Sequence, residues 1–217
     1  MSAEPSAATS ATLRFVDEPS ALAVLISRCQ AGESEAFRAL FIQHREAVAR
    51  IVYRMLGPRA KHELEDLIQE VFVQVFRSLR DFKGQSKFTT WLYRVTVNVV
   101  LMHRRAAKSR PQFEELPLLE RADERGAAAD EEVARQARMA AFYRLLNRLS
   151  EKKRTVFVLH ELEGLTPSEI AATVGAPALT VRTRLFYARR ELAAMMKDEP
   201  YLAHVPKELA LAEEENS

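Results

Sequence analysis

The sequence predicts an all-α protein built from two small helical domains that are joined by a flexible acidic linker. Apolar residues recur at helical spacing through most of the 217 residues. No segment alternates between apolar and polar residues for long enough to form a convincing strand. Between these helical stretches, residues 111–132 hold eight acidic residues and little apolar material. A chain of this length can bury two separate cores.

The first domain is expected over residues 19–108, after a disordered N-terminus at residues 1–18 that is rich in Ser, Ala, Thr and Pro. Two helices are predicted between residues 21 and 56, because Ala31-Gly32-Glu33 interrupts the apolar pattern and Gly57-Pro58 closes it. Further helices are predicted over residues 64–79, with a wide apolar face, and over residues 89–105.

The second half follows an acidic linker at residues 109–132, which contains Pro111 and Pro117. Helical periodicity resumes near Glu131, and a second domain is expected over residues 133–198. Residues 199–217 are interpreted as a flexible tail.

The most informative motif is a helix-turn-helix over residues 166–187. Thr166, Pro167 and Glu169 form an N-terminal capping signal for its first helix, and Gly175 ends that helix. Six residues later Val181 faces back into the helix pair, as this motif requires. An ordinary helical hairpin is the alternative, but the density of matching positions favours DNA binding. The side chains free to meet a major groove are then Arg182, Thr183, Phe186 and Tyr187.

A second nucleic-acid surface is predicted where aromatic and cationic residues alternate between Phe82 and Asn98. From residue 77 to 110 there are nine Lys or Arg against one acidic residue, which suits a phosphate backbone. Trp91 and Arg94 share one face of the predicted helix, where unpaired bases could stack on the indole. The residues alone leave two interpretations of Trp91 open, a base-stacking platform and a core side chain.

The third helix carries a polar stripe made of Asp66, Gln69 and Glu70, spaced to lie on one face. A solvated surface and a magnesium-dependent catalytic pair are alternatives, but no histidine or cysteine is placed to complete a metal site. We therefore expect no enzyme activity, no metal and no cofactor. The single cysteine, Cys29, is expected to be buried. With no secretory signal and no apolar run long enough to span a bilayer, a cytoplasmic protein without membrane insertion is expected.

Several of these segments together resemble the extracytoplasmic-function (ECF) group of bacterial sigma-70 family sigma factors. The first half resembles the family's second region in Asp66-Leu67-Ile68-Gln69-Glu70-Val71-Phe72, Phe82-Lys83-Gly84, Phe88-Thr89-Thr90-Trp91-Leu92-Tyr93-Arg94-Val95-Thr96-Val97-Asn98 and Arg104-Arg105. The second half, from Leu149-Ser150 through Leu192, is similar to the fourth region. The similarity covers both predicted domains in the family's order.

The resemblance implies that the chain directs core RNA polymerase to specific promoters and assists promoter melting. Its implied core-polymerase contacts are Asp66, Gln69 and Glu70. The implied contacts to the minus-10 element are Phe82, Lys87, Trp91, Tyr93, Arg94 and Asn98. Those implied for the minus-35 element are Arg182, Thr183, Phe186 and Tyr187 on bases, with Arg184 and Arg189 on phosphates.

The resemblance also implies a separate anti-sigma factor as a partner, and a linker that threads through polymerase. Two residues depart from the family pattern: Met102 stands where an acid is frequent, and Leu179 stands where glycine is frequent. An autonomous helix-turn-helix regulator is the alternative function, although it leaves the Trp91 cluster and the Asp66 stripe without a role.

Overall fold

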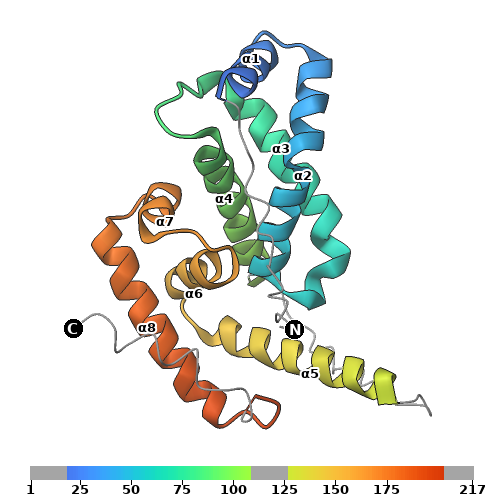
Figure 1. Cartoon of the computed structure of the whole chain (residues 1–217), viewed down its shortest axis with the longest axis vertical. Coiled ribbons are helices and arrows are strands. Elements are labelled where there is room, and N and C mark those ends of the chain that lie inside the picture. Colours follow the sequence, from blue (N-terminus) through green and yellow to red (C-terminus); the bar gives the residue numbers. More distant parts are fainter. Residues whose placement is uncertain (1–18, 109–126, 203–217) are drawn as a thin grey trace, which may run out of the picture.

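The computed structural model describes residues 19–108 and 127–202, and every regular element within them is helical (Figure 1). The all-α prediction is thus confirmed. The expected disordered N-terminus, residues 109–126 of the expected linker and residues 203–217 of the tail lie outside the described residues. None of the described helices is both long and apolar enough to cross a membrane.

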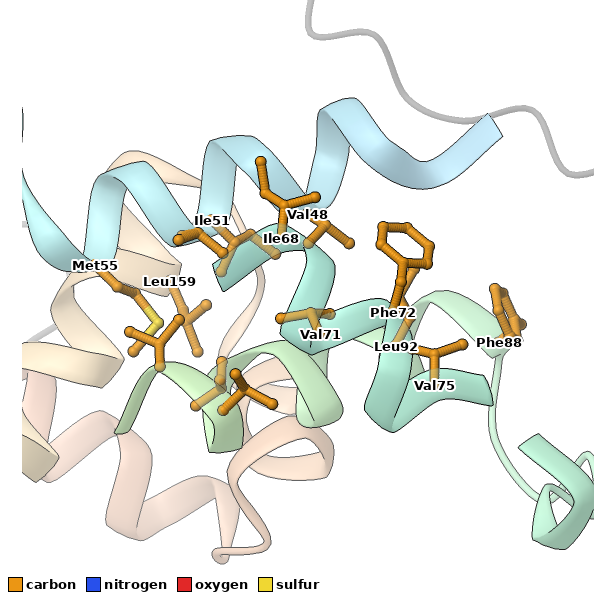
Figure 2. Packing of buried hydrophobic residues seen from close by; sticks show 14 of the residues in the cluster. Val48, Ile51, Met55, Ile68, Val71, Phe72, Val75, Phe88, Leu92 and Leu159 are labelled. Carbon is orange, nitrogen blue, oxygen red and sulfur yellow. The ribbon is translucent and has the colours of Figure 1, made fainter. Parts of the chain in front are cut away.

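The first half contains α1 (Pro19–Gln30), α2 (Ser34–Leu56), α3 (Leu64–Ser78) and α4 (Phe88–Lys108), with short 3₁₀ segments η1 (Pro58–Glu63) and η2 (Leu79–Asp81). Its core lies between α2, α3 and α4, where the apolar stripes predicted from the sequence meet. Figure 2 shows Val48 and Ile51 of α2 facing Ile68 and Val71 of α3, with Leu92 of α4 completing the cluster.

The second half contains α5 (Ala127–Arg148), α6 (Glu151–Phe157), the π-helical turn η3 (Val158–Leu162), α7 (Pro167–Val174) and α8 (Ala178–Lys197). Its own apolar cluster centres on Leu146, Phe157 and Leu192. Leu202 is only 5% exposed and joins this cluster, so the first residues of the expected tail are held by packing.

The start of α5 differs from the sequence expectation, which placed the helix from about Glu131. The helix begins four residues earlier, at Ala127, because three consecutive alanines are strong helix formers even without an apolar face. Cys29 is buried against the first core, as predicted.

The two halves pack against each other. Figure 1 shows α7 beside α4, and α6 between α4 and α5. Leu159 of η3 enters the first-half core near Met55 (Figure 2). The two halves therefore meet along one seam, formed by α4 with α7, α2 with η3 and α5 with η1.

Candidate nucleic-acid interface

The helix-turn-helix motif is capped as its sequence predicts. Thr166 Oγ1 accepts a hydrogen bond from the Glu169 backbone N–H (3.3 Å), and the Thr166 N–H donates to Glu169 Oε2 (2.9 Å). Pro167 opens α7, and Gly175 ends it with a left-handed φ of 64°. These local signals fix where α7 begins and ends, and so place the turn before α8.

The recognition helix α8 buries one side and exposes the other. Val181 and Ala188 are fully buried, and Leu185 and Leu192 are nearly so. The four side chains predicted to face a major groove all lie on the exposed side: Arg182, Thr183, Phe186 and Tyr187. Because the buried residues anchor the helix, this exposed side is presented as a rigid surface.

Some side chains on the exposed side of α8 are held in place by contacts with their neighbours. Thr183 Oγ1 donates to the Leu179 carbonyl (3.0 Å), and the rings of Phe186 and Tyr187 meet edge to face at 5.3 Å. The ammonium of Lys153 lies 5.9 Å from the centre of the Tyr187 ring. Arg182 makes no hydrogen bond or ion pair to any described residue, so its guanidinium is available to a base edge.

The two arginines assigned to phosphates have different surroundings. Arg184 is half-buried. Arg189 is turned toward η3, where its Nη2 lies 2.6 Å from Glu161 Oε1 and its Nε donates to the same oxygen at 2.7 Å. The phosphate role of Arg189 stays a prediction, and a DNA phosphate would have to compete with Glu161 for this side chain.

Trp91 combines features of both interpretations that the sequence left open. The indole is half-buried and contacts two rings, Phe82 at 5.2 Å and Phe88 at 5.6 Å between centroids. Gln30 Nε2 donates to the carbonyls of Leu79 (3.0 Å) and Phe82 (2.9 Å), which fixes the segment that carries Phe82. The cluster thus offers a preformed aromatic edge rather than a free indole.

The polar residues predicted on α4 divide between solvent and the seam. Lys87 and Asn98 are exposed. Arg94 is also exposed, but its guanidinium donates to the carbonyl of Ala172 in α7. Tyr93 is half-buried, and burial raises the pKa of its hydroxyl, reinforced by the negative charge of Glu163. The structure therefore brings two predicted minus-10 residues against the helix-turn-helix half.

The polar stripe on α3 is confirmed as a surface feature. Asp66, Gln69 and Glu70 are all exposed, opposite the buried Leu67 and Ile68. The Gln74 amide donates to Glu70 Oε1 at 3.0 Å, within the same helix. No cluster of three or more potential metal-ligating His, Cys, Asp or Glu side chains occurs among the described residues.

Sequence reasoning missed Glu163, whose side chain is only 2% exposed. Arg50 and Arg54 of α2 both contact its carboxylate, at 3.1 Å and 2.9 Å. One signal was present in the sequence. Glu161 and Glu163 are acidic residues at the end of a helical segment, where the helix dipole disfavours negative charge, so each needs a cationic partner.

Comparison with known proteins places both halves in one family. Residues 40–110 match the Sigma-70 region 2 family, and residues 139–192 match the Sigma-70 region 4 family. The chain is 32% identical over 176 residues to the ECF RNA polymerase sigma-E factor of Escherichia coli strain K12, a match that covers 78% of this chain and 91% of that protein. The corresponding Haemophilus influenzae factor is 31% identical over 173 residues, covering 76% and 89%.

A solved structure shares the arrangement of helices. CnrH, in complex with the cytosolic domain of CnrY, matches with a TM-score of 0.58 and 26% identity over 81% of this chain and 97% of that one. The two family matches, their order along the chain and the nearly full-length relatives agree with one another. The chain therefore belongs to the extracytoplasmic-function group of sigma-70 family RNA polymerase sigma factors.

Proposed function

We propose that this sigma factor divides promoter recognition between its two halves and catalyses no reaction itself. The helix-turn-helix half reads the minus-35 element, and the α4 surface holds the single strand that is exposed when the minus-10 element melts. The observation that carries this proposal is the one-sided burial of α8, which leaves Arg182, Thr183, Phe186 and Tyr187 as a continuous exposed face. Such a face fits the major groove.

The minus-10 role is supported by the aromatic edge of the half-buried Phe82 and Trp91, which is backed by the buried Phe88 and flanked by the exposed Lys87. A base that leaves the duplex can stack against such an edge while a cation follows the backbone. Because the rings already contact one another, the edge needs little reordering when DNA arrives. Asn98 lies exposed on the same helix and is assigned to the minus-10 element.

Two protein partners are proposed. Asp66, Gln69 and Glu70 dock on core RNA polymerase, since an exposed stripe that contributes nothing to the core is free to serve an interface. An anti-sigma factor is proposed as the second partner, because the similar protein CnrH is seen in complex with the cytosolic domain of CnrY. A chain that binds core polymerase and promoter DNA would act in the cytoplasm.

Run-off transcription with purified core polymerase and a genomic promoter library tests the proposal. We expect transcripts from a defined subset of promoters that share minus-35 and minus-10 elements. Polymerase without this chain is the control and should leave those promoters silent. Tight duplex binding by the chain alone, with no polymerase-dependent transcripts, would instead identify the autonomous regulator.

A further inference from the structure

The side chain of Leu179 is 72% exposed, a larger fraction than that of any other large apolar side chain in the part of the chain that the structure describes. It lies in the first turn of α8, directly after the turn that follows α7. Val181 and Leu185 supply the buried side of this part of the helix. A single exposed leucine is common on protein surfaces, so its exposure alone carries no function, and its position on the helix has to decide.

Leu179 lies in the middle of the exposed face of α8. At about 3.6 residues per turn, Phe186 follows Leu179 two turns later on the same line, with Arg182 to one side of that line and Thr183 to the other. All four side chains are exposed. The leucine therefore belongs to the face already assigned to the minus-35 element.

Thr183 adds a second apolar group next to Leu179. Its Oγ1 donates to the Leu179 carbonyl at 3.0 Å, which uses the one hydrogen that a hydroxyl can donate. Thr183 can then offer DNA an accepting oxygen and its methyl group. The first turns of α8 thus present two neighbouring apolar groups beside the guanidinium of Arg182.

The major groove has one apolar group on its base edges, the C5-methyl of thymine. In a helix-turn-helix, the N-terminal residues of the second helix contact these edges, and Leu179 is the second residue of α8. A leucine side chain cannot pair with an amino or carbonyl group, and covering such a group without a partner costs free energy. Packing against a methyl group removes apolar surface of both partners from water. The chemistry therefore favours thymine.

We propose that Leu179 determines specificity in the minus-35 element by packing against the C5-methyl group of a thymine, with the Thr183 methyl group beside it. The proposal rests on the minus-35 role assigned to α8 above. It divides base reading between an apolar contact to an A·T pair and a guanidinium contact from Arg182. A protein partner can also cover an exposed leucine, but the place of Leu179 between Arg182 and Thr183 favours a base.

Deoxyuridine tests this contact, because it pairs as thymine does and lacks only the C5-methyl group. Holoenzyme is assembled from core polymerase and the full chain, and the probe is a promoter duplex recovered by run-off transcription. Each thymine of the minus-35 element, on either strand, is replaced in turn by deoxyuridine. Competition binding then gives the ratio of affinities for the thymine and deoxyuridine forms.

Four variants accompany the unsubstituted chain. Leu179→Ala removes the contact without disturbing a buried side chain, and alanine favours a helix. Leu179→Met keeps an apolar side chain of similar volume. Arg182→Ala removes the neighbouring polar contact. Val24→Ala, at a residue that is 60% exposed on α1, is the matched control for loss of an exposed apolar side chain.

With Leu179 present, deoxyuridine at one position should weaken binding by about fourfold, the effect of burying one methyl group. Leu179→Ala should bind the thymine form more weakly, and the same replacement should then have no further effect. Leu179→Met should restore most of the ratio. Arg182→Ala should lower affinity and keep the ratio, and Val24→Ala should change neither.

A ratio of one at every thymine with the unsubstituted chain overturns the proposal, as does a minus-35 element without an A·T pair. An unchanged ratio in Leu179→Ala also overturns it, and weaker binding of that variant to core polymerase alone would then assign the side chain to a protein interface. If Arg182→Ala weakens promoter binding and Leu179→Ala does not, only the thymine contact fails. If neither variant weakens it, the minus-35 role of α8 fails as well.

Discussion

Arg182 and Arg189 lie two turns apart on α8 and have different electrostatic surroundings. Arg182 is exposed and makes no ion pair within the described part of the chain, whereas Arg189 is held by Glu161 at 2.6 Å. A free guanidinium can form a bidentate contact with guanine. A guanidinium that is already paired contributes less binding free energy to a new contact, because its existing bonds must first be lost.

Arg182→Ala should weaken minus-35 binding and flatten the preference at particular base pairs, at a cost of about 1–3 kcal/mol of discrimination. Arg189→Ala should weaken all sequences alike. Binding selections on a randomised minus-35 element, at two salt concentrations, measure both effects. Unchanged preference in Arg182→Ala would mean that specificity rests on Thr183, Phe186, Tyr187 or DNA shape.

Glu161→Gln separates two roles for Arg189. If Arg189 contacts a phosphate, only Arg189→Ala should reduce the salt dependence, by a slope of about one. If it mainly supports α8 through its ion pair, Glu161→Gln should reproduce the defect of Arg189→Ala without a change in slope.

Among the helices, α3 has one face that stabilises the fold and another that is free to bind a partner. Its apolar face is buried in the first core, while Asp66, Gln69 and Glu70 contact solvent. A helix arranged in this way can lose exposed charges with little change in its packing.

The double variant Asp66→Ala with Glu70→Ala should bind core polymerase more weakly while its free energy of unfolding changes by no more than about 1 kcal/mol. Fluorescence anisotropy with core polymerase and urea unfolding give the two values. Glu46→Ala, an exposed acid on α2, is the matched control. A double variant that binds core normally, or that unfolds, would contradict the assignment of the stripe.

Helix α7 is short, so its N-terminal cap contributes a large share of its stability. Thr166→Ala removes the capping side chain and should lower the free energy of unfolding by about 1 kcal/mol. Urea unfolding measures the loss, with Ser168→Ala in the same turn as the control, since Ser168 is exposed and outside the capping box. Equal stability of the two variants would show that tertiary packing alone fixes the start of α7.

For the whole molecule, the seam is the surface that holds the two helical halves together. Tyr143 of α5 lies at this seam beside Gly57. Burial raises the pKa of Tyr143 from 10 to about 12, with a further contribution from Tyr53. The folded chain therefore favours the neutral form of the Tyr143 hydroxyl over the ionised form.

Because the folded-state pKa lies above the unfolded value, Tyr143 contributes stability that is fully present below pH 10 and is lost as pH rises through about 12. Tyr143→Phe cannot ionise, so its urea midpoint should fall less steeply than that of the unsubstituted chain between pH 10 and 12. Tyr201→Phe, at an exposed position, should keep the original slope. Parallel profiles for all three proteins would contradict this role.

The helices, their order and the exposed side of α8 follow from the amino-acid sequence. These features depend on local signals: apolar spacing, the Thr166–Glu169 cap and Gly175. The exposed stripe of α3 and the exposed side of α8 follow from the same periodicity. The start of α5 at Ala127 was missed, since the apolar pattern begins later than the helix.

The way in which the two halves meet depends on contacts between residues far apart in the chain. Glu163 is buried by residues that precede it by more than one hundred positions, Arg50 and Arg54, and no periodicity encodes so distant a pairing. The same holds for the contact between Arg94 and α7 and for the partial burial of Trp91. Local patterns state which side of a helix is apolar, but the burial of a charge depends on the surface that comes to cover it.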